Sequence, residues 1–235
     1  MKMASPCDGT LSPTEFKFAA EALMKKWEEC KSILHPWIWI PCPKLPFGAP
    51  DKAGGYLSLE HIHHFEFKKQ QDCIEQKYSE EEVEALDSAT LVLSGENETH
   101  YYNFHIIYST SYKVPVLFFR GYHQGGQPLK CDEVEKDLPL YTSKLLEESK
   151  WTFITQEEHP YLNCPWFTLH PCGTSEWMRL LLQQRLYSSR PEDLCSHYLV
   201  AWFSVVGQVI GLWAPLNLVH CSSSSSSSDT FCSHT

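Results

Sequence analysis

The chain places its helix patterns at its two ends and its strand patterns between them. This order restricts the fold strongly, because a parallel sheet needs a crossover helix between successive strands. Near the start, Ser12 and Glu15 form a capping-box pattern around Pro13, and apolar residues then recur at helical spacing. A first helix is therefore predicted over residues 13–30.

Strand patterns follow, with polar or glycine-rich breaks between them. They predict extended segments at residues 37–40, 54–67, 89–94, 101–108, 114–122, 151–154 and 165–169. Gly125 and Gly126 mark a turn, and residues 132–150 are partly helical in pattern. The part of this strand at residues 114–120 is apolar on both faces, and Pro115 favours a position at or near a sheet edge, because proline has no N–H to donate.

Two helices are predicted to close the fold. The first covers residues 175–186, with Thr174 as its cap and with Trp177, Leu180 and Leu181 on its apolar face. The second begins near Tyr198 in an apolar run. As a helix that run would span only about 24 Å, against the roughly 30 Å of a bilayer core, so we expect a buried helix and no stable membrane insertion.

The predicted class is therefore α+β: an antiparallel β-meander with an N-terminal helix and C-terminal helices. The helices and strands do not alternate, so a dinucleotide-binding fold is disfavoured and no cofactor is predicted. A length of 235 residues, 43% of them hydrophobic, suits one domain, placed at residues 1–218. Within it, residues 68–87 read as a mobile acidic insertion. Residues 219–235, which contain a serine run, read as a disordered tail.

Charge and cysteine usage limit the partners and the compartment. The net charge of -10 argues against nucleic acid or an anionic membrane as the main partner. The first residues do not resemble a signal peptide, so a cytoplasmic location is expected. The 10 cysteines are irregularly spaced with no Cys-x-x-Cys pair, which predicts reduced thiols and gives no support for a zinc ribbon.

The candidate site is the stretch 166–177, where an apolar strand passes through a tight turn into a helix. Cys172 lies just before that helix, whose positive N-terminal end favours a thiolate, and Gly173 lets another backbone approach closely. Cys172 is therefore a candidate nucleophile. Free cysteines are also common packing residues, so these local features leave that alternative open.

Nearby histidines and cysteines suggest other chemistry that the sequence supports less well. His61 and His63 share a strand face while His64 points away, and no nearby ligand completes a metal set, so no metal is predicted. His170 has the spacing for a Cys-His hydrolase, but no third group is identified and a structural role is favoured. Cys164 can be considered as an oxidation partner of Cys172, although a packing role is simpler.

Four motifs together resemble the autophagy-related protein ten family of E2-like enzymes. They are the His-Pro-Cys-Gly-Thr run at 170–174 and residues 111–120, 154–160 and 201–212, within a similarity that spans about residues 16–218. The resemblance implies a ubiquitin-conjugating (E2)-like fold. It also implies that Cys172 accepts the ubiquitin-like autophagy-related protein twelve as a thioester from the E1-like autophagy-related protein seven. The modifier would then pass to a lysine of autophagy-related protein five.

The resemblance leaves two alternative functions open, and it does not identify the group that stabilises the oxyanion. The chain is also similar to the sister E2-like enzyme that conjugates autophagy-related protein eight to a lipid, and an inactive E2-like binding module is the other alternative. Ordinary ubiquitin E2 enzymes carry an upstream His-Pro-Asn whose amide serves the oxyanion, and this chain has none. Asn103 and Asn163 are weak candidates for that role. Backbone N–H groups would have to come from the start of the helix, at Gly173, Thr174 or Ser175.

Overall fold

The computed structural model describes most of the predicted domain. The described residues are 6–30, 35–42, 53–64, 99–139, 141–143, 153–186, 190–212 and 218. The acidic insertion expected at 68–87, the strand expected at 89–94 and the tail at 219–235 lie outside them.

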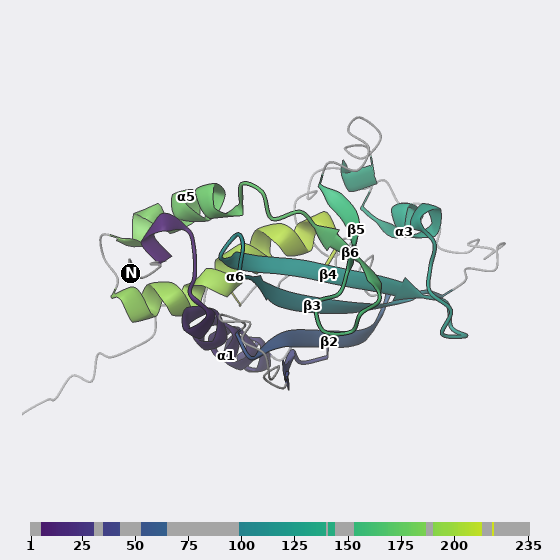
Figure 1. Ribbon diagram of the computed structural model, residues 1–235, viewed down its shortest axis with the longest axis horizontal. Coiled ribbons are helices and arrows are strands. Elements are labelled where there is room, and N and C mark those ends of the chain that lie inside the picture. The colour runs from purple at the N-terminus through teal and green to yellow at the C-terminus, as the bar shows by residue number, and fades with distance from the viewer. Residues whose placement is uncertain are drawn as a thin grey trace, which may run out of the picture.

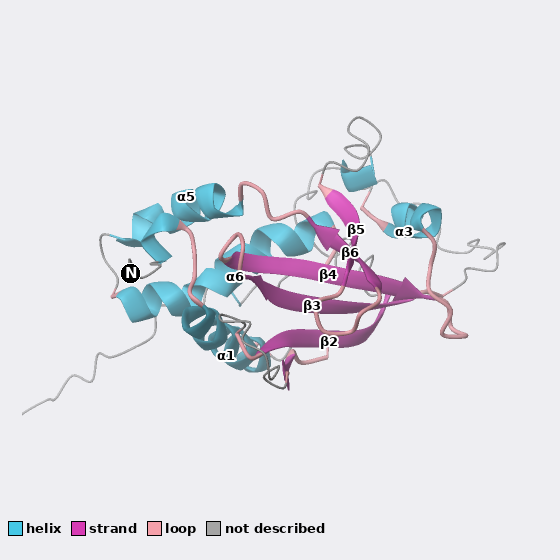
Figure 2. Cartoon of the chain, viewed as in Figure 1, coloured by secondary structure: helices cyan, strands magenta, loops and turns pink. Residues whose placement is uncertain are grey.

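The strands of the described residues form one antiparallel sheet with helices around it, which confirms the α+β class (Figures 1 and 2). The 6-stranded sheet has the order β1-β2-β3-β4-β6-β5. Its strands are β1 (Ile38–Pro41), β2 (Gly55–His63), β3 (Tyr101–Ser109), β4 (Val114–Tyr122), β5 (Ile154–Glu158) and β6 (Pro165–Leu169). The first four strands form the predicted meander. The β5–β6 hairpin then turns back, so that β6 pairs with β4 and β5 becomes an edge.

Strand β4 has the predicted bounds but not the predicted edge position. It lies inside the sheet between β3 and β6, so the edge prediction is wrong. The ladder to β6 joins only Phe118 to Thr168 and Phe119 to Phe167, and so it does not reach Pro115. The missing N–H of Pro115 therefore costs no hydrogen bond to β6.

Helices of the described residues lie before, between and after the strands. They are α1 (Pro13–Glu29), α3 (Cys131–Asp137), α5 (Thr174–Leu186) and α6 (Pro191–Val209), preceded by a short 3-10 turn, η1 (Pro6–Asp8). The capping box at α1 is confirmed, because the Glu15 N–H donates to Ser12 Oγ and the Ser12 N–H donates to the Glu15 carboxylate. Helix α6 starts earlier than predicted because Pro191 begins it.

The predicted apolar face of α5 is wrong for Leu180 and Leu181, while Trp177 is half-buried and packs against the core. Leu180 is 60% exposed and Leu181 is 46% exposed, whereas Met178 and Leu182 are buried at i, i+4 spacing. Thr174 is the first helical residue and not the cap, since the positive-φ residue Gly173 precedes the helix. Packing against the rest of the protein, rather than the hydrophobicity of α5 alone, selects the face that is buried.

Each face of the sheet has its own apolar cluster, as strand alternation requires. The larger cluster joins the sheet to α1 and α6 and contains the edge-to-face rings of Trp27, Trp37 and Phe203. The smaller one, on the opposite face, consists of Tyr56, Ile107, Val116, Phe118 and Trp166. Both apolar faces of β4 are therefore covered within the protein. No helix of the described part is long and apolar enough to cross a membrane.

Candidate active site

Cys172 lies at the tip of the turn between β6 and α5. The His170 N–H donates to the Phe153 carbonyl at 2.8 Å, which ties the end of β6 to the start of the β5 segment. Gly173 has a φ of 76°, a conformation that suits glycine, and it redirects the chain into α5. Cys172 is exposed, so its thiol is open to a reaction partner at the positive end of the helix dipole.

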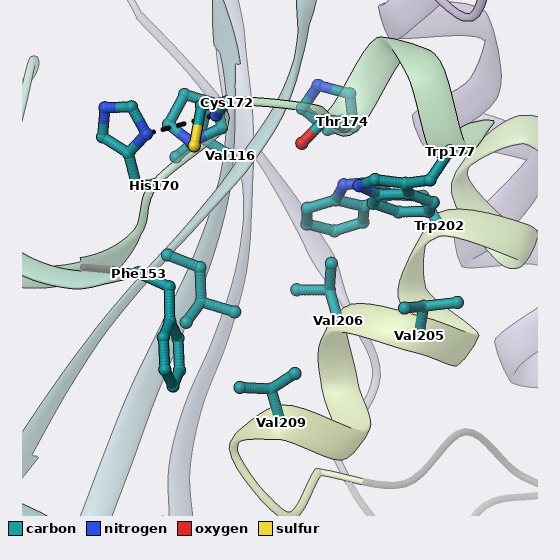
Figure 3. Close-up of a pocket in the computed structure, with 13 residues that line it drawn as sticks. Val116, Phe153, His170, Cys172, Thr174, Trp177, Trp202, Val205, Val206 and Val209 are labelled. Atoms are coloured by element: carbon teal, nitrogen blue, oxygen red, sulfur yellow. Dashed lines mark hydrogen bonds between the residues drawn. The ribbon is translucent and has the colours of Figure 1, made fainter. Parts of the chain in front are cut away.

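His170 makes its contacts within this turn. Its Nδ1 accepts a hydrogen bond from the Cys172 N–H at 3.2 Å (Figure 3), and Tyr112 packs edge-to-face against its ring with centroids 5.7 Å apart. An accepting Nδ1 leaves the proton of the neutral ring on Nε2. This contact supports the structural role that the sequence favoured.

Hydrogen bonds within the turn already engage some of the backbone N–H groups that could stabilise an oxyanion. The Thr174 N–H donates to the Pro171 carbonyl at 3.1 Å, and the Cys172 N–H is engaged by His170. Of the three backbone donors considered from sequence, Gly173 and Ser175 therefore remain as candidates.

The two asparagines considered as oxyanion donors make other contacts in the fold. Asn103 lies on β3 opposite Arg120, and its Oδ1 accepts from the His61 N–H at a bulge of β2. Asn163 is a positive-φ residue in the β5–β6 turn, and its N–H donates to the His159 carbonyl at 3.1 Å. Asn103 lies near the start of β3, and Asn163 precedes β6, at the opposite end of that strand from the Cys172 turn, so the structure supports neither as a donor.

Two hollows flank the His170–Pro171 segment, and Pro171 and Val116 line both of them. The first has a volume of about 170 Å³, is mostly apolar and includes Cys172 in its wall (Figure 3). The second has a volume of about 360 Å³ and includes the more polar 108–112 turn and Glu157. The thiol therefore has an apolar cavity directly beside it.

The N-terminal segment supports the site, which sequence reasoning missed. Gly9, at a φ of 79°, packs so closely against α5 that a Cβ there would lie 1.8 Å from the Ser175 carbonyl oxygen. The Tyr198 hydroxyl donates to the Gly9 carbonyl at 2.6 Å, and the Leu11 N–H donates to the Lys113 carbonyl at 2.8 Å. Sequence offers only an Asp-Gly turn signal here, since the contact with α5 is long-range.

A buried histidine pair lies on the face of the sheet that carries the smaller apolar cluster, away from α1 and α6. His159 Nδ1 accepts from the N–H groups of Tyr161 and Leu162, so its Nε2 carries the proton and donates to His105 Nδ1 at 2.8 Å. Burial lowers the pKa of His105 to about 3, helped by the nearby His159, and burial lowers the pKa of His159 to about 4. Both rings are therefore neutral at ordinary pH.

The other groups considered from sequence lie apart from the thiol. A bulge between Leu59 and Ile62 breaks the strand alternation that placed His61 and His63 on one face. His64 instead reaches α3, with its Nε2 at 2.9 Å from the Asp137 carbonyl oxygen. Among the described residues, no group of His, Cys, Asp or Glu side chains is arranged to hold a metal ion.

Cys164 cannot pair with Cys172 in this fold. It precedes β6, receives a hydrogen bond from Arg120 at 3.2 Å and packs against the smaller apolar cluster. The extended residues of β6 separate the two thiols by well over the roughly 7 Å Cα limit for a disulfide. This supports the packing role for Cys164.

Comparison with known proteins identifies the family. The model of the family described as "Autophagocytosis associated protein, active-site domain" matches residues 15–217. The chain is 46% identical over 224 residues to ubiquitin-like-conjugating enzyme ATG10 of Arabidopsis thaliana, covering 91% of this chain and 96% of the relative. It is 36% identical over 138 residues to human ATG10, covering 58% of this chain and 60% of that protein.

Among solved structures, the autophagic E2 Atg10 aligns over 90% of this chain and 99% of its own, with 13% identity and a TM-score of 0.40. The family match and the near full-length identity to the Arabidopsis thaliana protein carry the assignment. The chain therefore belongs to the autophagocytosis-associated active-site family and, within it, to the ATG10 group of E2-like, ubiquitin-like-conjugating enzymes.

Proposed function

We propose that Cys172 carries a ubiquitin-like modifier as a thioester and passes it to a lysine of an acceptor protein. The observation that carries this proposal is an exposed thiol at the His-Pro-Cys turn ahead of α5. The modifier is autophagy-related protein twelve, the E1-like donor is autophagy-related protein seven, and the acceptor is autophagy-related protein five. These partners rest on the family, and the enzyme acts in the cytoplasm as a single domain spanning residues 1–218.

The chemistry consists of two acyl transfers. The Cys172 thiolate attacks the thioester carbonyl of the activator-bound modifier, and the activator's thiolate leaves as the new thioester forms. A deprotonated lysine amine of the acceptor then attacks this carbonyl, forms an amide as its nitrogen gives up a proton to water, and releases the Cys172 thiolate. Negative charge develops on the carbonyl oxygen in both steps, and the N–H groups of Gly173 and Ser175 are the proposed backbone donors that stabilise it.

The test is a charging assay with a matched cysteine control. The purified chain is incubated with activator, modifier and ATP, and adducts are separated with and without reductant. Among the described residues Cys7 is the other exposed cysteine, so Cys7→Ser is the control for Cys172→Ser. We expect a reductant-sensitive adduct for the parent and Cys7→Ser, and none for Cys172→Ser. A reductant-sensitive adduct on Cys172→Ser would show that another cysteine is the nucleophile.

The same assay separates the two alternatives. Adding the acceptor protein in one tube and phosphatidylethanolamine vesicles in another shows which acceptor discharges the thioester. We expect discharge by the protein only, because the chain covers 96% of the Arabidopsis thaliana ATG10. An inactive binding module would form no adduct at all.

A further inference from the structure

We propose that the apolar pocket beside Cys172 receives one large apolar side chain from the last few residues of the modifier, and so selects which modifier tail is loaded. This inference rests on the proposed function, because it takes the modifier to be linked to Cys172. The pocket lies between the end of β6, the start of α5 and the α6 face toward β4 (Figure 3).

The pocket has a buried floor and an open mouth. Trp202, at 1% exposed, and the buried Val206 come from α6, and the buried Val116 comes from β4. Val205, 42% exposed, and the half-buried Trp177 lie at the rim. Apart from Cys172 itself, its polar lining consists of His170 and Thr174. Such walls suit an apolar guest, because a polar side chain would lose its hydration there and find few partners.

The position of the thiol determines what can reach the pocket. Cys172 forms part of the wall, so any chain acylated on its Sγ starts at the pocket. Successive residues of an extended chain are about 3.3 to 3.6 Å apart, so only the last few residues of the modifier lie within reach. A volume of about 170 Å³ holds one large side chain rather than a folded surface. The tether also supplies a high effective concentration.

The acceptor lysine fits this pocket less well. Its amine must approach the thioester carbonyl while remaining deprotonated, and the mostly apolar wall offers few hydrogen-bond acceptors to orient it. The second hollow, across Pro171, is lined by the more polar 108–112 turn and leaves a separate approach open. The apolar pocket is therefore assigned to the modifier tail.

The test pairs a change at the rim with changes in the tail. Val205→Asn makes the rim polar without adding a charge near the thiol, and Leu181→Asn is a control of similar exposure outside the pocket. The donor is activator that has been pre-charged with modifier. In a set of modifier variants, each of the last residues before the terminal residue is replaced by alanine in turn. The measured quantity is kcat/KM for loading of Cys172.

We expect one apolar tail position whose alanine form loads about 10- to 100-fold more slowly, the equivalent of burying one large apolar side chain. Val205→Asn should load the native tail roughly fivefold more slowly and should reduce the effect of that alanine change, while Leu181→Asn loads like the parent. Equal alkylation rates of Cys172 by iodoacetamide in all three proteins show that the thiol itself is unchanged.

Two outcomes overturn the inference while leaving the proposed function intact. One is parent-like loading by Val205→Asn together with no sensitive apolar tail position. The other is normal loading by Val205→Asn with slowed transfer to the acceptor, which would assign the pocket to the acceptor. If the parent forms no reductant-sensitive adduct at all, the proposed function fails instead.

Discussion

The His105–His159 pair predicts a loss of stability in mild acid. The folded protein holds both rings neutral, with pKa values lowered by burial to about 3 and about 4, whereas the unfolded chain has pKa values of about 6.5. Between these limits the unfolded state binds more protons, so the free energy of unfolding falls as the pH falls. The contribution is fully present above about pH 6.5 and is lost progressively below it.

The size of this loss depends little on the folded pKa values. From about pH 7.5 to about pH 5.5, each histidine that stays neutral in the fold costs about 1.4 kcal/mol, because the unfolded chain alone is protonated. The pair therefore removes about 2.7 kcal/mol, a large part of the 5 to 15 kcal/mol that is typical of a domain. Among the described residues, Glu60 is the carboxylate that lies within 4 Å of His105; its Oε1 is 3.6 Å from His105 Nε2, and its side chain is half exposed.

His105→Asn isolates one half of this effect. The asparagine Oδ1 can take the place of His105 Nδ1 as acceptor for the His159 Nε2–H, so the contact is kept and one titrating group is removed. Urea unfolding of the parent and the variant at both pH values gives the two pH-dependent losses. We expect the loss in the variant to be smaller by about 1.4 kcal/mol. Equal losses would refute this account of the pair.

An NMR titration tests the same idea without a substitution. The ring C–H signals of His105 and His159 should keep their neutral positions from about pH 7.5 to about pH 5.5. If either ring titrates with a midpoint near 6.5, the pair is not held neutral by the fold and the predicted acid sensitivity has no basis.

Three further predictions concern packing. Gly9→Ala should cost about 2 kcal/mol and slow thioester loading, because its methyl group collides with the Ser175 backbone of α5; urea unfolding and the charging assay measure both. Leu117→Asp and Phe118→Asp should each cost more than about 3 kcal/mol by urea unfolding, since both side chains are buried, and a stable, folded Phe118→Asp protein would contradict the covered face. Truncation after Leu218, which is buried against the core, should leave the melting temperature and charging unchanged; loss of soluble protein would give the tail a structural role.

The features that depend mainly on neighbouring residues were predicted correctly from the sequence. The bounds of β4, the capping box at Ser12 and the turn that presents Cys172 all follow from neighbouring residues, and the structure has them in place. The prediction of the apolar face of α5 was wrong for Leu180 and Leu181. Both faces of the helix carry leucines, and tertiary packing alone selects Met178 and Leu182 for burial. No local pattern indicates which leucines are covered.

The contacts that the sequence missed join residues far apart in the chain. Gly9 packs against Ser175 of α5, and His105 on β3 is hydrogen-bonded to His159 in the β5–β6 turn. The position of β4 was also wrong, because the hairpin of β5 and β6 folds back to place β6 beside it. Pro115 favours an edge, and it is accommodated inside the sheet because the β6 ladder stops short of it.

The central claim is that the acyl group resides on one sulfur, and mass spectrometry locates it directly. The parent chain, charged with modifier, activator and ATP, is quenched at low pH and digested without reductant, and the peptide that carries the modifier's terminal residue is sequenced. We predict that this residue is attached to Cys172, and that hydroxylamine releases it. Attachment to Cys7 or to any other residue, with Cys172 unmodified in the charged protein, would contradict the account.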